Sequence, residues 1–145
     1  MLINTNIKTT TKWLGDKKNP EKQIRVFERS HNNSLSIPDT IWRNNTNKAA
    51  ADLSVADFDK QSLRFQFGIL ADTEIYTRVY NKTSKEKFEA IPENQIIELK
   101  LVYNNEENKN ITTTILKNIL KHVGEFYGFS PWGNKFGYGR FEIYE

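Results

Sequence analysis

Apolar residues recur with two different periods along this chain, and this pattern constrains the fold more than any other feature. Over residues 112–123 the apolar residues form one stripe of a helix, which Thr112 or Thr113 can cap and Gly124 is expected to end. A second helix is expected from about residue 39 to residue 52, because Pro38 suits a first turn and apolar spacing follows it.

The remaining apolar segments alternate with a period of two, which is typical of strands. Strands are predicted over residues 2–14, 24–27, 63–70, 74–80, 88–91, 95–103 and 140–144. The segments 63–70 and 74–80 could form a hairpin across a short polar break. This order predicts an α+β fold, and its simplest match is a single ferredoxin-like (βαββαβ, RRM-related) domain over residues 1–145. Such a domain has a mainly antiparallel sheet with two helices on one face.

Composition excludes several classes of protein. Among 145 residues there is no cysteine and there are two histidines, His31 and His122. A disulfide framework and a thiolate metal site are therefore excluded, and we expect neither a metal nor a cofactor. No segment has the roughly 18 consecutive apolar residues of a membrane helix, and a signal peptide is not evident, so we expect a cytoplasmic protein without a membrane partner.

The charge is distributed unevenly along the chain. The net charge is +3, from 21 Lys and Arg residues against 18 Asp and Glu residues. Residues 1–48 carry nine basic and four acidic groups, whereas residues 49–116 carry eight and eleven. A basic first third favours a polyanionic partner, although a biased surface composition would give the same pattern.

Glycine and aromatic residues are concentrated in residues 124–145. Five of the seven glycines and eight of the eighteen aromatic residues lie in this segment. Glycine permits positive φ, interleaved rings can stack on bases, and the backbone amides of such a loop can surround an anion. The alternative is a loop whose rings fill the core. Neither the Rossmann nor the Walker glycine pattern is present.

Two motifs combine glycine or proline with aromatic and basic residues. The first is the pair of glycines Gly124 and Gly128, followed by NKFGYGRF at residues 134–141; the second is LSIPDTIWR at residues 35–43. Together these motifs resemble the RAMP superfamily of CRISPR-associated RNA-binding proteins. Small phage-encoded RAMP-like proteins of unknown role have a similar layout. The resemblance implies a ferredoxin-like fold and RNA binding through the glycine-rich loop, although Asp39 and Thr40 stand where family members commonly have Gly and Lys.

The candidate nucleic-acid contacts are aromatic and basic side chains. They are Lys135, Tyr138, Arg140, Trp132, Arg43, Tyr76 and Arg78. The loop backbone is expected to contribute at Gly128, Gly133, Gly137 and Gly139. His31, in a polar loop, is the weak candidate for a catalytic acid or base.

Three functions follow from these residues. The first is binding of single-stranded RNA or DNA by the glycine-rich loop and the basic first third of the chain. The second is a phage or mobile-element protein that docks on, or mimics, a RAMP subunit of a host defence complex. The third is a metal-independent ribonuclease that uses His31. The expected partners are therefore single-stranded nucleic acid, a protein complex, or both.

Overall fold

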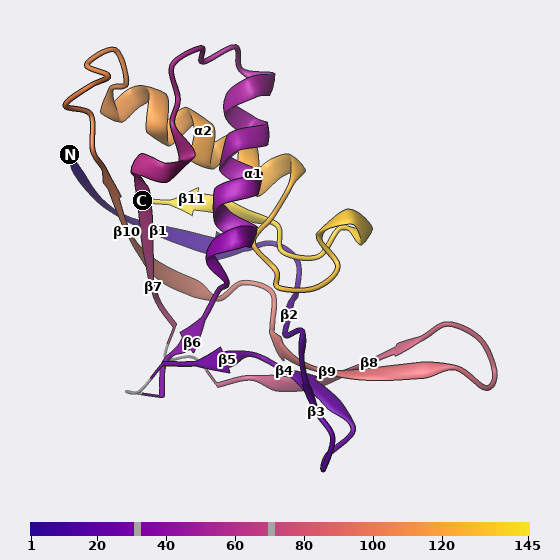
Figure 1. The fold of residues 1–145 in the computed structure, drawn as a ribbon. Coiled ribbons are helices and arrows are strands. Elements are labelled where there is room, and N and C mark those ends of the chain that lie inside the picture. The colour runs from indigo at the N-terminus through magenta and orange to yellow at the C-terminus, as the bar shows by residue number, and fades with distance from the viewer. Residues whose placement is uncertain (31–32, 70–71) are drawn as a thin grey trace.

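The central sheet lies at the core of the computed structural model, which describes residues 1–30, 33–69 and 72–145. Its strands are β1 (Leu2–Thr9), β7 (Leu63–Gly68), β10 (Ile96–Tyr103) and β11 (Phe141–Tyr144). They lie in the order β11-β1-β10-β7, and all three neighbouring pairs are antiparallel. Figure 1 shows helices α1 (Asp39–Asp52) and α2 (Thr113–Phe126) against this sheet.

Both helices cover the same face of the central sheet. Along β10, residues 97, 99, 101 and 103 are buried and the residues between them are exposed. The buried residues share one apolar core with Trp42 of α1 and Leu120 of α2. The α+β class, with two helices and mostly antiparallel sheets, is therefore confirmed.

A second sheet extends from one end of the central sheet and includes a long hairpin that projects from the molecule (Figure 1). Its strands are β2 (Trp13–Leu14), β3 (Lys17–Asn19), β4 (Ile24–Val26), β8 (Glu74–Val79) and β9 (Lys85–Ile91). Their order is β2-β9-β4-β3, with β8 paired to β9 and with β4 and β9 parallel. Because a βαββαβ plan has no second sheet, the whole chain fits a ferredoxin-like domain only loosely.

Short elements complete the described chain. Strands β5 (Glu28–Arg29) and β6 (Leu35–Ser36) pair with each other, and two 3₁₀ turns, η1 (Lys60–Ser62) and η2 (Asn134–Phe136), precede β7 and Gly137. None of the helices in the described ranges is long and apolar enough to cross a membrane.

Two strand predictions were wrong. Segments 63–70 and 74–80 do not form a hairpin, because β7 pairs with β10 and β8 pairs with β9. Alternation indicates which side chains share a face but not which strand lies alongside. The first strand ends at Thr9 instead of residue 14, because the amide of Thr10 donates to the Arg140 carbonyl and the chain then enters the second sheet.

Helix α1 has the predicted bounds, and Thr112 caps α2 as predicted by accepting from the Ile115 amide. Gly124 does not end α2, which continues to Phe126. A Cβ at Gly124 would lie 2.3 Å from the Phe141 carbonyl oxygen. This glycine therefore allows α2 to approach β11 closely, and the chain leaves the helix through Gly128, at φ +88°.

Candidate functional site

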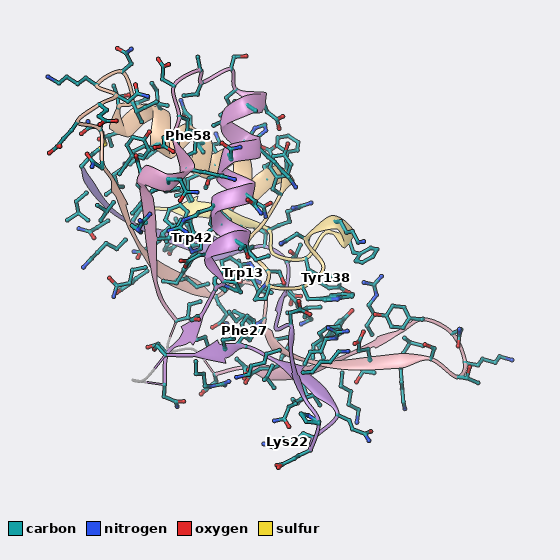
Figure 2. The ribbon with its side chains drawn as sticks, in the orientation of Figure 1. Trp13, Lys22, Phe27, Trp42, Phe58 and Tyr138 are labelled. Atoms are coloured by element: carbon teal, nitrogen blue, oxygen red, sulfur yellow. The ribbon has the colours of Figure 1, made fainter. Side chains whose placement is uncertain are left out.

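The segment after α2 folds onto the second sheet and brings residues far apart in sequence into one cluster. Four rings surround the guanidinium of Arg78, on β8, and they belong to Tyr80, Trp132, Phe136 and Tyr138. A fifth ring, that of Tyr76, packs against Tyr138. We call Arg78 and these five rings the aromatic cluster. Figure 2 shows Tyr138 between the yellow segment and the β8–β9 hairpin.

Arg78 lies over four of these rings. Its guanidinium carbon is 4.4 Å from the ring centre of Phe136, 5.1 Å from Tyr80, 5.3 Å from Trp132 and 5.7 Å from Tyr138. Such cation–π contacts stabilise a guanidinium but supply no hydrogen-bond acceptor. The Nη1 atom is buried and has no hydrogen-bond partner in the described chain. Arg78 is therefore a cation with an unused donor at a partly exposed aromatic surface.

The second sheet fixes the position of the loop. Trp132 donates its amide to the Leu14 carbonyl at 3.0 Å, and its ring lies 4.7 Å from that of buried Phe88. Gly133 and Gly137 have φ values of +85° and +94° on either side of η2, as expected for glycines in a tight turn. The rings are thus held on a rigid support.

Tyr76 and Tyr138 join the two segments directly. Their hydroxyl oxygens are 2.9 Å apart, and their rings pack edge to face. Burial and the hydrogen bond to Tyr76 raise the pKa of Tyr138 to about 12. The phenol is therefore neutral at physiological pH and does not oppose an anionic ligand.

The strands of the second sheet carry six basic and three acidic side chains, and the acids are already paired. Glu74 pairs with Lys12, Glu86 with Arg25, and Glu89 with Arg29. Burial opposes ionisation of Glu86 and Glu89, but hydrogen bonds from their arginines outweigh it and lower both pKa values. Of the basic side chains on these strands, those without an ion pair are Lys17, Lys18, Arg78, Lys85 and Lys87. The register of β8 with β9 places Lys85 and Lys87 on the face opposite Arg78.

The backbone of the glycine-rich loop is mostly occupied by internal hydrogen bonds. The amides of Gly128, Gly137 and Gly139 donate to the carbonyls of Val123, Asn134 and Lys12. The Asn134 side chain accepts from the Ser130 amide at 2.8 Å and donates to the Ser130 carbonyl at 2.7 Å. At these three glycines, the backbone amides expected to bind an anion are thus already hydrogen-bonded within the protein. The side chains are therefore better candidates for contacting an anionic ligand.

Four of the seven predicted side chains, Tyr76, Arg78, Trp132 and Tyr138, belong to the aromatic cluster, and Lys135 is beside it, with its Nζ 5.2 Å from the Phe136 ring centre. Arg43 and Arg140 are not brought into the cluster. Arg43 lies over its neighbour Trp42 at 4.8 Å and pairs with Asp39 at 3.7 Å.

Arg140 lines a separate hollow of about 750 Å³ between α2, β11 and Thr10–Thr11. Burial lowers the pKa of Arg140, and its Nη1 has no partner in the described chain. Three glutamates, Glu125, Glu142 and Glu145, also line this hollow, so it does not favour an anion. His31 lies outside the described residues.

Sequence reasoning left three contributors out of its set of site residues. Tyr80 and Phe136 are part of the aromatic cluster, and Lys12 places its Nζ 5.7 Å from the Tyr76 ring centre. Tyr80 follows Tyr76 and Arg78 at the same two-residue spacing, so the sequence pattern could have placed it on the same face of the strand. No sequence pattern pointed to Lys12, because its contact with Tyr76 depends on the turn that links the two sheets.

His122 has a structural role between the helices. Its Nε2 lies 3.0 Å from Asp52 Oδ2, and Tyr127 donates to the same carboxylate. These hydrogen bonds lower the pKa of Asp52. In the described part of the chain, no three His, Cys, Asp or Glu side chains are grouped so that they could hold a metal ion.

No protein-family model matches the chain, and no curated protein matches it. Solved structures do match, at low sequence identity. One is a chain of the Type III-B Cmr-beta complex bound to cognate target RNA, with a TM-score of 0.64, 13% identity, and coverage of 99% of this chain. This protein spans 58% of the length of that chain. A chain of a CRISPR RNA-guided surveillance complex matches with a TM-score of 0.42 and 10% identity, over 97% of this protein and 66% of that chain.

The similarity to the Cmr-beta chain shows a shared fold.

Proposed function

We propose that the protein binds single-stranded nucleic acid through the aromatic cluster and Lys135 beside it. One observation carries the proposal: Arg78 has a buried Nη1 without an acceptor and lies among rings that remain partly exposed. A rotation of the half-buried guanidinium toward solvent would let a phosphate oxygen supply the missing acceptor. The rings offer faces on which bases can stack, at about 1–3 kcal/mol per base.

Single strands fit this surface better than a duplex. Bases in a duplex are stacked on each other and present only their edges, whereas bases of a single strand are free to lie on aromatic rings. Phe136 is 52% exposed, and Lys135 beside it is exposed. Together with Tyr80, which is 46% exposed, these two side chains form the accessible rim of the aromatic cluster.

RNA is the favoured nucleic acid. The Cmr-beta neighbour is from a complex bound to target RNA, and we propose that the central sheet and its helices form a ferredoxin-like module of the RAMP type. The order β11-β1-β10-β7, with one helix after β1 and one after β10, supports this assignment.

Docking on a protein complex is the second candidate. The chain covers 58% of a subunit of a multi-component complex, so a similar position in such an assembly is possible for this fold. Stable capture of a partner protein, together with no affinity for any nucleic acid, would favour docking over direct binding.

The test compares two lysine variants for binding to fluorescently labelled single-stranded RNA, single-stranded DNA and duplex at several salt concentrations. Lys135→Gln removes an unpaired charge beside the aromatic cluster, and Lys109→Gln is its matched control, from the loop between β10 and α2. We expect single strands to bind with a steep salt dependence. Lys135→Gln should reduce the slope of log affinity against log salt by about 0.7, and Lys109→Gln should leave it unchanged. Equal effects of the two variants, or no binding at low salt, would refute the proposal.

A further inference from the structure

One face of the central sheet is uncovered. The two helices and the apolar core lie on the other face, so the outward residues of β10 are exposed along its whole length. From one end of the strand to the other they are Ile96, Glu98, Lys100 and Val102. We call the surface formed by these residues and their neighbours on β1, β7 and β11 the open face.

Large apolar side chains are concentrated on the open face. Leu2 is 57% exposed, Ile96 51%, Tyr144 43% and Val102 41%. They account for four of the ten exposed large apolar side chains in the described ranges. The strand register places Leu2 beside Val102, so apolar groups lie at both ends of a polar centre. Apolar groups arranged in this way are unfavourable in water and typical of a contact surface.

The polar centre is complementary to a copy of itself. Two copies can meet through their open faces about a twofold axis that lies in the plane between the sheets, runs across the strands and passes over Leu99 of β10. This axis would place Glu98 of one copy opposite Lys100 of the other, and Ile96 opposite Val102. Neither Glu98 nor Lys100 has an ion pair within the described residues. The same operation therefore forms two ion pairs and two apolar contacts from one strand.

The neighbouring strands fit the same symmetry at the positions beside Glu98 and Lys100, although farther out the axis places Lys8 opposite Leu2. Asn4 and Gln66 flank Lys100, and Asn6 and Gly68 flank Glu98. The axis would place Asn4 opposite Asn6, whose amides can hydrogen-bond, and the long side chain of Gln66 opposite Gly68, which has none. A hollow of about 550 Å³ lined by Gly68, Glu98 and Lys100 provides room for these side chains.

We infer that two copies of this chain associate through their open faces about this twofold axis. The four strands and the length of β10 give a face of roughly 20 Å by 20 Å, which is at the low end for specific interfaces. The association is therefore weak and depends on concentration. It leaves the aromatic cluster, on the second sheet, free for nucleic acid, so it stands independently of the proposed function.

The open face is a poorer match for nucleic acid. It carries the carboxylates of Glu98 and Glu142 and a single aromatic ring, that of Tyr144. Arg64, on β7, already donates to the carbonyls of Gln61 and Leu63. Phosphates would meet both signs of charge and few stacking faces here.

The experiment is a charge exchange measured by sedimentation equilibrium up to about 1 mM, because an interface of this size is expected to bind weakly. The mass of the natural chain should rise from 17.0 kDa towards twice that value. Glu98→Lys and Lys100→Glu should each remain monomeric, because like charges then face each other. An equimolar mixture of these two variants should associate, and the double variant with both changes should regain association.

Lys109→Glu is the matched control and should associate like the natural chain. Circular dichroism must show an unchanged fold in every variant. Monomers at all concentrations, association of the single variants equal to that of the natural chain, or association only when RNA is added would each overturn the inference. The last outcome would assign the open face to nucleic acid.

Discussion

At the scale of single residues, the site depends on Arg78, which has aromatic neighbours but lacks an acceptor. Replacing it with alanine removes both the proposed phosphate contact and the cation that packs against the rings. We expect Arg78→Ala to weaken binding of single-stranded RNA about tenfold, or about 1.4 kcal/mol, and Arg78→Lys to weaken it less. Arg64→Ala, on the edge strand β7, is the control in the same anisotropy titration. Equal losses in Arg78→Ala and Arg64→Ala would contradict the assignment.

Tyr138 offers a test of the cluster that needs no ligand. Burial and the Tyr76 hydrogen bond raise its pKa to about 12, so its ionisation should be delayed in a spectrophotometric titration of the six tyrosines. Because the folded pKa exceeds the usual value of 10.0, stability from this group is present below pH 10 and is lost as pH rises towards 12. In Tyr138→Phe the most strongly delayed component should disappear, whereas the smaller delays of Tyr80 and Tyr127, whose pKa values are also raised, should remain. Persistence of the most strongly delayed component in the variant would show that another tyrosine is responsible.

At Gly137, the energetic cost of the backbone conformation can be measured separately from the cost of side-chain packing. Its φ is +94°, and a Cβ there would meet nothing within 4 Å, so only the backbone conformation demands glycine. We expect Gly137→Val to cost about 1–2 kcal/mol of unfolding free energy and Gly137→Asn clearly less, because asparagine tolerates this region. Urea unfolding of both variants measures the difference. Equal costs would mean that the turn adopts another conformation.

At the scale of elements, Glu89 ties three segments of the chain together. It accepts from Arg29 at 2.6 Å, from the buried Phe27 amide at 2.9 Å and from Thr73 at 2.9 Å. Glu89→Gln leaves Arg29 without its counter-charge, and we expect a loss of about 1.5–3 kcal/mol in unfolding free energy at neutral pH.

The pH dependence of the same variant gives a second readout. Burial opposes the charge on Glu89, but its donors hold the pKa below the usual 4.5. The stability that this carboxylate contributes is therefore present above pH 4.5 and is lost as pH falls through the lowered pKa. The difference in unfolding free energy between the natural chain and Glu89→Gln should therefore become smaller over that pH range. A difference in unfolding free energy that stays constant down to low pH would argue against the ion pair between Glu89 and Arg29.

The elements differ in how well sequence predicted them. The helices were recoverable because helical periodicity and caps are local, and α1 has the predicted bounds. The pairing of β7 with β10 and of β8 with β9 was not recoverable, because strand alternation carries no information about the partner strand. The role of Gly124 was missed for a similar reason, since its close neighbour, Phe141, lies on a different element.

At the scale of the whole molecule, a central sheet with two helices carries a second sheet that supports the candidate site. Sequence predicted the α+β class and named four side chains that the fold brings together, because glycine spacing and aromatic alternation are visible in the chain. It did not separate Arg43 and Arg140 from these four, since their distance from the cluster depends on tertiary structure.

The central claim, that bases stack on the aromatic cluster, can be measured through tryptophan fluorescence. Trp13 and Trp42 are buried in the core, whereas Trp132 is partly exposed in the cluster. Titration with single-stranded RNA should quench the emission of the natural chain, and Trp132→Phe should lose that quenching while keeping most of its affinity by anisotropy. Equal quenching in Trp132→Phe, or no quenching at saturating RNA, would contradict the account.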